Sequence, residues 1–506
     1  MPRIGGVIKK KVSEASPKRL LPEQALRSVT SKSGLGVYAS SDTLFKDAVF
    51  GRDSLEVAED LLYTKPKLVK NIILTIASLQ GENRHSANEE EPGKIIHEYR
   101  TTTIDGKPID QVSLQIFDRL SQEWGGSSTV MAYYGSIDST PLFIRLLIRY
   151  VQKYGPGILL ERVKLRSGEL VSVLEVLDRA VQWMLDKLSE SKCGLLEYVR
   201  INPHGIKNQA WKDSDEFYMH ANGRHANHEK PIASIEVQAL AYDALVLTAE
   251  LLPSWSKLKP VAARLQKNTV KLLWMEKEQY FALGFDHSAR SRRRVLKVST
   301  ANPAEMLNSR FFLDMEETDR QKYVGAIIMH IMSSDFLTDA GIRSRSLSEA
   351  NLVHHWDYHG SFVSWPKETY DIANGLRLHG FPRLANELFN RILNITHASR
   401  SYPEFVYVDR QGRVLGTGLV SSHHGEIILV EAQNRPERIQ AWTVSAALGI
   451  LARDKMPRPD AASEWQKKLE SQILKSIPHV NLLKSKKELN ARYPSYPYEL
   501  KGGLTR

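Results

Sequence analysis

The stretch IASIEVQALAYDALVLTAELL at residues 232–252 decides the fold class of this chain. Its apolar residues recur at intervals of three and four positions, which is the period of an amphipathic α-helix and not that of a β-strand. Eight further segments repeat this pattern, at residues 54–63, 67–81, 140–155, 168–188, 255–275, 368–380, 382–396 and 438–453. Helical segments in this number, separated by polar loops, predict an all-α domain.

Strand signals are few and short by comparison. They are confined to residues 293–300, to a hairpin at 404–416 and to residues 427–432. Long polar stretches separate the helices, at residues 82–135, 190–231, 341–366 and 400–437. Because loops of this length in a compact domain are usually functional, we expect the site to lie there.

No shift in composition divides the 506 residues into several domains. We expect one domain over residues 36–480, preceded by a basic, flexible arm over 1–35 and followed by a tail over 481–506. The arm is predicted because Lys, Ser, Pro and Gly are frequent in it and no helical period is present.

Charge and cysteine content exclude several classes of protein. The chain has 69 Lys and Arg against 58 Asp and Glu, a net charge of +11, but the excess lies in separate short clusters without interleaved aromatic residues. We therefore expect no nucleic-acid partner. A single cysteine, Cys193, excludes a disulfide scaffold and is typical of a cytoplasmic protein. No apolar run is long enough to span a membrane, and the N-terminal stretch lacks the apolar core of a signal peptide.

The long loops concentrate Trp, Tyr, His, Asp and Glu. A pocket of aromatic faces and carboxylates suits a neutral polyhydroxylated ligand, since sugar C–H faces stack on rings while polar side chains bind hydroxyl groups. Two carboxylates placed across such a pocket are the requirement for glycoside hydrolysis, in which one protonates the leaving oxygen and the other activates water or attacks.

Seven motifs in sequence order carry a resemblance to a known family. They are FGRDSL (50–55), GKIIHEYR (93–100), YYGSIDSTPLF (133–143), NQAWKDS (208–214), PIASIEVQ (231–238), YHGSFVSWP (358–366) and IQAW (439–442). Together they resemble the catalytic domain of the glycogen-debranching, or amylo-α-1,6-glucosidase, family of six-hairpin glycosidases. The resemblance implies an (α/α)6 barrel with its active site at one end, and hydrolysis of an α-linked gluco-oligosaccharide by a carboxylate pair.

The chain departs from the family pattern at several positions. Ala210 stands where the family has glycine, no proline precedes Ala441, and the spacing between His359 and Trp365 differs. The first motif lies at residue 50, which leaves no room before it for the β-rich domain common in the family, and a smaller saccharide becomes the more plausible substrate.

The resemblance implies a catalytic role for two carboxyl groups. Asp213 in the NQAWKDS motif matches the family's general acid, and Asp215 is its neighbouring rival. Glu404 in the element YPEF matches the general base, with Glu426 and Glu431 as competitors. The implied mechanism inverts the anomeric centre, which requires carboxyl groups roughly 6.5–9.5 Å apart.

The same motifs supply candidate substrate-binding residues. These are Arg52, Asp53, His97, Glu98, Arg100, Tyr134, Asp138, Gln209, Trp211, Lys212, Gln238, His359, Trp365 and Trp442. Histidine pairs such as His354–His355 and His423–His424 match no metal-ligand spacing, and no nucleotide-binding fingerprint is present, so we expect neither a metal nor a cofactor.

Two alternative functions stay open at this point. One is a hydrolase on the same barrel that acts on another glycoside, as trehalase-like, invertase-like or mannosylglycerate-hydrolase-like enzymes do. The other is a carbohydrate-binding relative that has lost activity. Fold alone cannot separate these possibilities.

Overall fold

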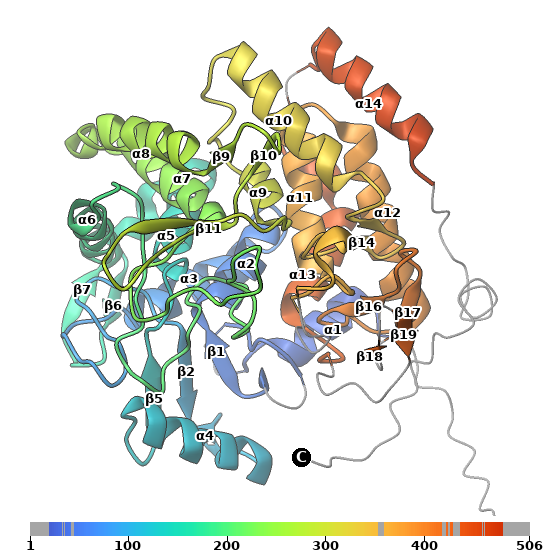
Figure 1. Ribbon diagram of the computed structural model, residues 1–506. Helices are drawn as coiled ribbons and strands as arrows, with labels where there is room; N and C mark the ends of the chain where they lie inside the picture. Colours follow the sequence, from blue (N-terminus) through green and yellow to red (C-terminus); the bar gives the residue numbers. More distant parts are fainter. Residues whose placement is uncertain are drawn as a thin grey trace, which may run out of the picture.

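The computed structural model describes residues 20–32, 34, 36–41, 45–352, 359–416, 421–423, 426–428, 436–457, 459 and 461–478. Within them the chain is predominantly helical (Figure 1). The helices are α1 (Pro22–Val29), α2 (Gly51–Asp60), α3 (Pro66–Ser78), α4 (Gln111–Trp124), α5 (Ser139–Tyr154), α6 (Val173–Glu190), α7 (Ile235–Leu251), α8 (Leu258–Leu273), α9 (Asn302–Glu305), α10 (Glu317–Ile331), α11 (Pro366–Leu378), α12 (Pro382–Ser399), α13 (Ala441–Leu451) and α14 (Glu464–Ser476).

Six of these helices form a closed ring of contacts. In order, α2 packs on α5, α5 on α7, α7 on α9, α9 on α11, α11 on α13, and α13 on α2. A second set covers the ring from outside: α3 packs on α2, α6 on α5, α8 on α7, α10 on α9, α12 on α11 and α1 on α13. With α4 set aside, ring and covering helices therefore alternate along the chain from α2 to α13.

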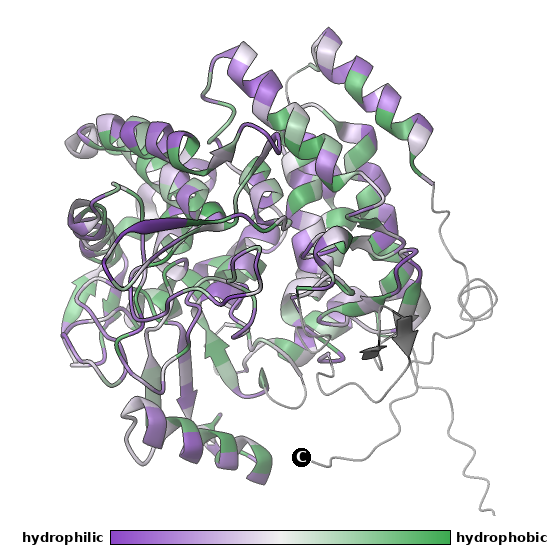
Figure 2. Ribbon diagram, viewed as in Figure 1, coloured by the Kyte–Doolittle hydropathy of each residue, from purple (hydrophilic) through white to green (hydrophobic). Residues whose placement is uncertain are grey.

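Burial distinguishes the ring helices from the covering helices. In α7, 14 of 17 residues are buried, whereas α8 buries only five of 16, at intervals of three and four. The expectation of an amphipathic helix is therefore wrong for α7, because this ring helix is packed on all sides and its buried residues are not confined to one face. Figure 2 shows the alternation of hydrophilic and hydrophobic turns on α8 and α14, as expected of helices with one face in solvent.

Short antiparallel strands lead into several ring helices. A three-stranded sheet in the order β1 (Ala48–Phe50), β2 (Glu98–Thr101), β5 (Val130–Tyr133) precedes α2 and α5. In a second sheet, of β12 (Arg293–Leu296), β11 (Gly284–His287) and β8 (Ala233–Ser234), the strand β8 leads into α7. In a third, of β15 (Val363–Ser364), β16 (Val406–Val408) and β17 (Val414–Gly416), the strand β15 leads into α11.

The other strands form two-stranded pairs. These are β3 (Thr103–Ile104) with β4 (Lys107–Pro108), β6 (Arg162–Lys164) with β7 (Leu170–Ser172), β9 (Trp274–Met275) with β10 (Tyr280–Phe281), β13 (Leu337–Thr338) with β14 (Gly341–Ile342), and β18 (Ser421–His423) with β19 (Glu426–Ile428). In Figure 1, α4 lies at one end of the molecule beside β5.

Each of the nine helices expected from the sequence is present, within a few residues of its expected bounds. The strands expected near residue 293 and in the hairpin at 404–416 are also present. The helices α1, α4, α9, α10 and α14 were not expected. No helix in the described ranges is long and apolar enough to cross a membrane.

The flexible arm predicted over residues 1–35 needs a correction. Residues 22–29 form α1, whose buried Ala25, Leu26 and Val29 lie on the face packed against α13. These three residues recur at the helical spacing of one and three, so burial of one apolar stripe orders this segment. Residues 1–19 and the predicted tail over 481–506 lie outside the described residues.

Candidate active site

The starts of the ring helices converge on one region of the molecule. This region contains Arg52 and Asp53 of α2, Asp138 before α5, Glu236 of α7, Glu305 of α9, Trp365 and Glu368 at α11, and Gln440 and Trp442 at α13. The N-terminal end of a helix carries partial positive charge from its unpaired N–H groups and stabilises nearby anions. Convergence of helix starts thus favours the concentration of carboxylates found here.

Two adjoining cavities occupy this region. The first, of about 390 Å³, is called the Asp213 cavity and is lined by Phe45, Phe50, Arg52, Asp53, His97, Trp211, Asp213, His359, Trp365, Glu404, Gln440 and Trp442. The second, of about 650 Å³, is called the inner chamber because its lining extends to the second turns of the ring helices, as at Arg145 and Asp371. Arg52, Trp211 and Trp442 line both cavities.

A close approach at Gly51 positions the first two polar residues of the site. A Cβ atom on Gly51 would lie 1.9 Å from the carbonyl oxygen of Ile96, so only glycine can begin α2 at this point. The Gly51 N–H donates to the carbonyl of His97 at 2.8 Å. This turn places Arg52 and Asp53 on the first turn of α2, at the wall of the Asp213 cavity.

Asp213 and Glu404 both line the Asp213 cavity but have different surroundings. The Asp213 side chain is partly exposed, and its Oδ2 lies 3.7 Å from Nη1 of Arg52. Glu404 is buried, and its Oε2 accepts a hydrogen bond of 3.0 Å from the N–H of Glu437. Burial, together with the negative charges of Glu437, Asp53 and Asp213, raises the pKa of Glu404 well above its usual value.

Arg52 organises the carboxylates of α2 and α5. Its Nε donates to Oδ2 of Asp138 at 2.8 Å, and both side chains are buried. Asp53 accepts from Nε2 of Gln440 at 3.2 Å. Burial raises the pKa of Asp53 to about 7, although the positive charge of Arg52 acts in the opposite direction.

Four buried polar atoms in the wall of the Asp213 cavity have no hydrogen-bond partner within the described structure. They are Nη2 of Arg52, Nδ1 of His97, Oε1 of Gln440 and Nε1 of Trp442. Buried polar groups in native proteins are almost always paired, so a cluster of unpaired donors and an acceptor at one cavity indicates a polar ligand. Hydroxyl groups can pair with both donors and acceptors.

Aromatic rings form the remaining wall. Trp211 meets the rings of His359, Trp365 and Trp442 edge-on, at centroid distances of 5.3, 5.6 and 6.4 Å. The His359 ring stacks on Trp365 at 4.9 Å, and its burial near Lys212 lowers its pKa well below the usual value. His359 is therefore neutral at physiological pH and cannot supply a positive charge to the site.

The structure brings nine of the sixteen predicted site residues to the Asp213 cavity, and Asp138 to the inner chamber. The other six line neither cavity: Glu98, Arg100, Tyr134, Gln209, Lys212 and Gln238. Arg100 pairs with Glu98 within β2. Fully buried Lys212 binds Glu368, Asn302 and the carbonyl of Ser344.

The remaining three of these six residues hold loops. Gln238 donates to the carbonyls of Leu196 and Ser234, both at 2.9 Å. The Tyr134 hydroxyl donates to the carbonyl of Leu79, and Gln209 donates to Glu89. These three side chains bind protein groups and line neither the Asp213 cavity nor the inner chamber, where they were expected.

The structure also describes two of the three residues that were alternatives to the catalytic pair. Asp215 is exposed and forms a surface ion pair with Lys207. Glu426 begins β19, and Glu431 lies outside the described residues. Several lining residues were not predicted from the sequence, namely Phe45, Phe50, Glu56, Glu236, Glu305, Lys367, Glu368, Asp371 and Gln440.

Among the described residues, no group of three or more His, Cys, Asp or Glu side chains could hold a metal ion. His354, His355 and His424 lie outside those residues. The carboxylates of the two cavities instead have Arg, Lys, Trp, Ser and Gln partners, as at Glu305, whose Oε1 accepts from Nε1 of Trp211 at 2.9 Å.

The raised pKa of Asp53 gives a first prediction. Between pH 4 and about 7 the folded state keeps this proton while the unfolded state loses it, so the free energy of unfolding falls as pH rises. The Asn side chain in Asp53→Asn cannot ionise. We therefore expect the free energy of unfolding of this variant to fall by about 2–3 kcal/mol less than that of the wild type between pH 5 and 8. Urea denaturation of both proteins at the two pH values measures this. Identical pH dependence in the two proteins would contradict it.

Comparisons with known proteins relate the fold to solved structures only. No protein-family model and no curated protein matches the chain. A conserved protein of Thermus thermophilus is 13% identical, with a TM-score of 0.54 over 86% of this chain and 99% of that one. A GH63 mannosylglycerate hydrolase of Thermus thermophilus, in complex with glucose, is 12% identical, with a TM-score of 0.53 over 86% of this chain and 100% of that one.

A glycosidase in complex with glucose is also similar to the chain, at 12% identity and a TM-score of 0.50, over 86% of this chain and 96% of the other. The likeness extends over nearly the whole length of each of these structures. The chain therefore has the same helical fold as these glycosidases.

Proposed function

We propose that the protein is a glycoside hydrolase in which Asp213 and Glu404 are the catalytic pair. The observation that carries the proposal is their common place in one cavity, beside three tryptophans and four unpaired buried polar atoms. Aromatic faces suit the C–H faces of a sugar ring, and the unpaired donors and acceptor suit its hydroxyl groups. The fold shared with glycosidases supports the same class of chemistry.

The proposed reaction is a single displacement by water. One carboxylic acid donates its proton to the glycosidic oxygen as the bond from that oxygen to the anomeric carbon breaks. The second carboxylate takes a proton from water as the water oxygen forms its bond to the anomeric carbon, which inverts the configuration. Arg52, Asp53, His97 and Trp442 would hold the sugar hydroxyls, since each lines the cavity and three of them carry unpaired atoms.

The two roles follow from the resemblance: Asp213 is the acid and Glu404 the base. One observation favours the reverse assignment. The pKa of Glu404 is raised by burial, which favours its protonated form. If Glu404 is the base, kcat/KM rises with pH through its raised pKa, and if it is the acid, kcat/KM falls through that pKa.

We further propose that the ring of α2, α5, α7, α9, α11 and α13, with its covering helices, is an (α/α)6 barrel of the six-hairpin type. The closed order of contacts supports this, as does the alternation of ring and covering helices along the chain. The location of the site at the helix starts agrees with an active site at one end of such a barrel.

For the substrate we propose a small O-glycoside, with glycosyl glycerates ahead of α-1,6-linked gluco-oligosaccharides. The fold shared with a mannosylglycerate hydrolase supports the first, whereas only the motif resemblance supports the second. We expect sugar release from at least one of mannosylglycerate, glucosylglycerate, isomaltose, panose, trehalose and sucrose, measured by chromatography of the products. Release from none of them, nor from a branched dextrin, would overturn the proposed activity.

A further inference from the structure

A third cavity, of about 610 Å³, lies between α6 and the loop that follows it. Its lining includes Trp183 and Lys187 of α6, the stretch from Glu197 to Val199, and Gln209. We call it the α6 cavity. It shares no lining residue with the Asp213 cavity or the inner chamber, so it is a separate space.

The charges in the α6 cavity largely cancel. Lys187 lies 2.6 Å from Glu91 and 3.3 Å from Glu190. Lys94 is buried, 3.8 Å from Oε1 of Glu91, and its Nζ lies 5.9 Å from the centroid of the Trp183 ring. With Glu197, three carboxyl groups face two ammonium groups, so the cavity does not select strongly for an anion or a cation.

Two of the buried polar atoms in this lining that lack a hydrogen-bond partner in the described structure are Nε1 of Trp183 and Oε1 of Glu197. Trp183 is only 4% exposed, and Oε1 of Glu197 has a single ion-pair neighbour, Nδ1 of His287 at 3.7 Å. One atom is a donor and the other an acceptor, so a single ligand that satisfies both must have groups of both kinds.

Most tryptophans of this chain do not share this property. The indole N–H groups of Trp124, Trp211, Trp255, Trp274 and Trp465 all donate to carbonyl or carboxylate oxygens. Apart from Trp183, the described tryptophan whose buried Nε1 lacks an acceptor is Trp442, in the wall of the Asp213 cavity. Trp183 thus resembles a residue placed at a ligand cavity.

The rim of the α6 cavity is apolar and exposed. Val199 is 38% exposed and Ile201 is 50% exposed, and both belong to its lining. Tyr198, which also belongs to the lining, is buried. Apolar side chains and aromatic rings beside unpaired polar atoms match the mixed surface of a sugar, which has apolar C–H faces and hydroxyl edges.

We propose that the α6 cavity is a second saccharide-binding site, for a neutral sugar unit of one or two rings. The proposal does not require Asp213 and Glu404 to be catalytic, because it rests on a different lining.

The α6 cavity is also lined by Gln209, which belongs to the loop that carries Asp213. The Tyr198 hydroxyl lies 3.3 Å from Oδ1 of Asn208, and Nδ2 of Asn208 donates to the carbonyl of Ser214 at 2.6 Å. The carbonyl of Gln209 accepts from the N–H of Ile137 at 2.7 Å. A sugar bound against Tyr198 and Gln209 would therefore contact the two residues through which the loop is held.

Calorimetric titration of the full-length protein with D-glucose and with D-mannose tests the proposal, because neither sugar has a glycosidic bond to hydrolyse. We expect at least one of these sugars to bind with a stoichiometry of two molecules per protein chain. Trp183→Phe keeps a ring but removes the N–H, and we expect it to weaken one equivalent at least about tenfold. Glu197→Gln should weaken the same equivalent and serves as the second variant if Trp183→Phe fails to fold.

Two matched variants separate the sites. Trp255→Phe removes an indole that is already paired with Asp178 of α6 and should leave both equivalents unchanged. Trp442→Phe should weaken only the equivalent at the Asp213 cavity. A single equivalent sensitive to Trp183→Phe and insensitive to Trp442→Phe would support the second site while counting against the proposed active site. Binding that is unchanged in both Trp183→Phe and Glu197→Gln, or absent for both sugars, would overturn the second site.

Discussion

Asp213→Asn and Glu404→Gln are each expected to lower kcat by about 10²–10⁴-fold on the substrate identified from the glycoside panel. Both changes keep the size of the side chain and remove its ability to transfer a proton. Because neither Asp213 nor Glu404 holds a covering helix in place, we expect the variants to unfold at temperatures close to that of the wild type. Initial rates at saturating substrate, with thermal denaturation as a check on folding, measure the effect.

The same variants assign the acid and the base. An aryl glycoside with a good leaving group needs no proton from the enzyme, so Asp213→Asn should hydrolyse it far better than the natural substrate if Asp213 is the acid. Glu404→Gln should be slow on both substrates. Added azide, which needs no base, should restore cleavage by that variant. The opposite pattern in the two variants would show that Glu404 is the acid, as its raised pKa favours.

Asp215→Asn is the matched control for Asp213→Asn. Asp215 is two residues away, but it is exposed and ion-paired with Lys207, and surface ion pairs contribute little. We expect kcat within about twofold of the wild type, since this surface pair is outside the cavity. If both Asp213→Asn and Glu404→Gln kept the wild-type rate, the proposed active site would be wrong.

The helices of this fold could be predicted from the sequence because their apolar period is a local property. The segment at residues 382–396, for example, reappears as α12 over Pro382–Ser399. The ring could not be predicted in the same way, because it depends on which helices meet. The helix α7 is buried on all sides, but its apolar residues also recur at the helical period. The period alone therefore does not show whether such a helix is fully buried or has one face in solvent.

The catalytic candidates could be proposed from the sequence because the order of the motifs identifies the loops that carry them. The direction in which each side chain points could not be predicted. In α7, Gln238 was predicted in the pocket, yet Glu236 lines the inner chamber and Gln238 clamps Leu196. Two positions along a helix differ by about 200° in direction, so a motif that contains both does not show which faces inward. The loop residues Trp211 and Lys212 differ in the same way, one at the cavities and one buried behind them.

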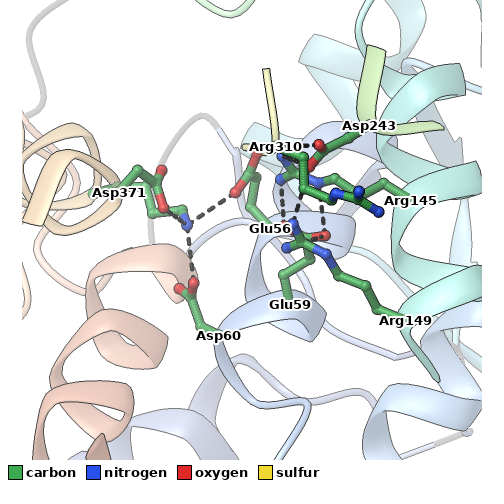
Figure 3. Close-up of polar contacts among 9 residues, drawn as sticks. Glu56, Glu59, Asp60, Arg145, Arg149, Asp243, Arg310 and Asp371 are labelled. Carbon is green, nitrogen blue, oxygen red and sulfur yellow. Dashed lines mark hydrogen bonds and ion pairs between the residues drawn. The ribbon is translucent and has the colours of Figure 1, made fainter. Parts of the chain in front are cut away.

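A buried ion network lies along the inner chamber and continues beyond it, and Lys367 is the central cation of one part. Its Nζ contacts carboxylate oxygens of Glu56 at 2.9 Å, Asp60 at 3.0 Å and Asp371 at 2.8 Å. Figure 3 labels these three carboxylates. Burial raises the pKa of Asp60 to about 6 and that of Asp371 well above its usual value, although Lys367 acts in the opposite direction on both.

The part of the network next to the Lys367 cluster contains two cations instead of one. Arg145 and Arg149 both pair with Glu59 and Asp243 (Figure 3). Those two carboxylates would each keep a guanidinium partner if one arginine were lost. Glu56 also interacts electrostatically with Arg145, whereas Asp60 and Asp371 have no second cation among their ion pairs in the described structure, so these two depend on Lys367 far more strongly.

Lys367→Met is therefore expected to lower the free energy of unfolding by about 3–5 kcal/mol at pH 8, because it leaves buried carboxylates without their cation. Loss of Lys367 raises the pKa of Asp60 and Asp371 further in the folded state. The variant should therefore lose stability as pH rises, and its deficit relative to the wild type should be smaller at pH 5. Lys322→Met, which removes an exposed partner of Glu276, should cost less than about 1 kcal/mol. Urea denaturation at both pH values measures these costs, and equal costs for the two variants would show that the buried network does not depend on Lys367.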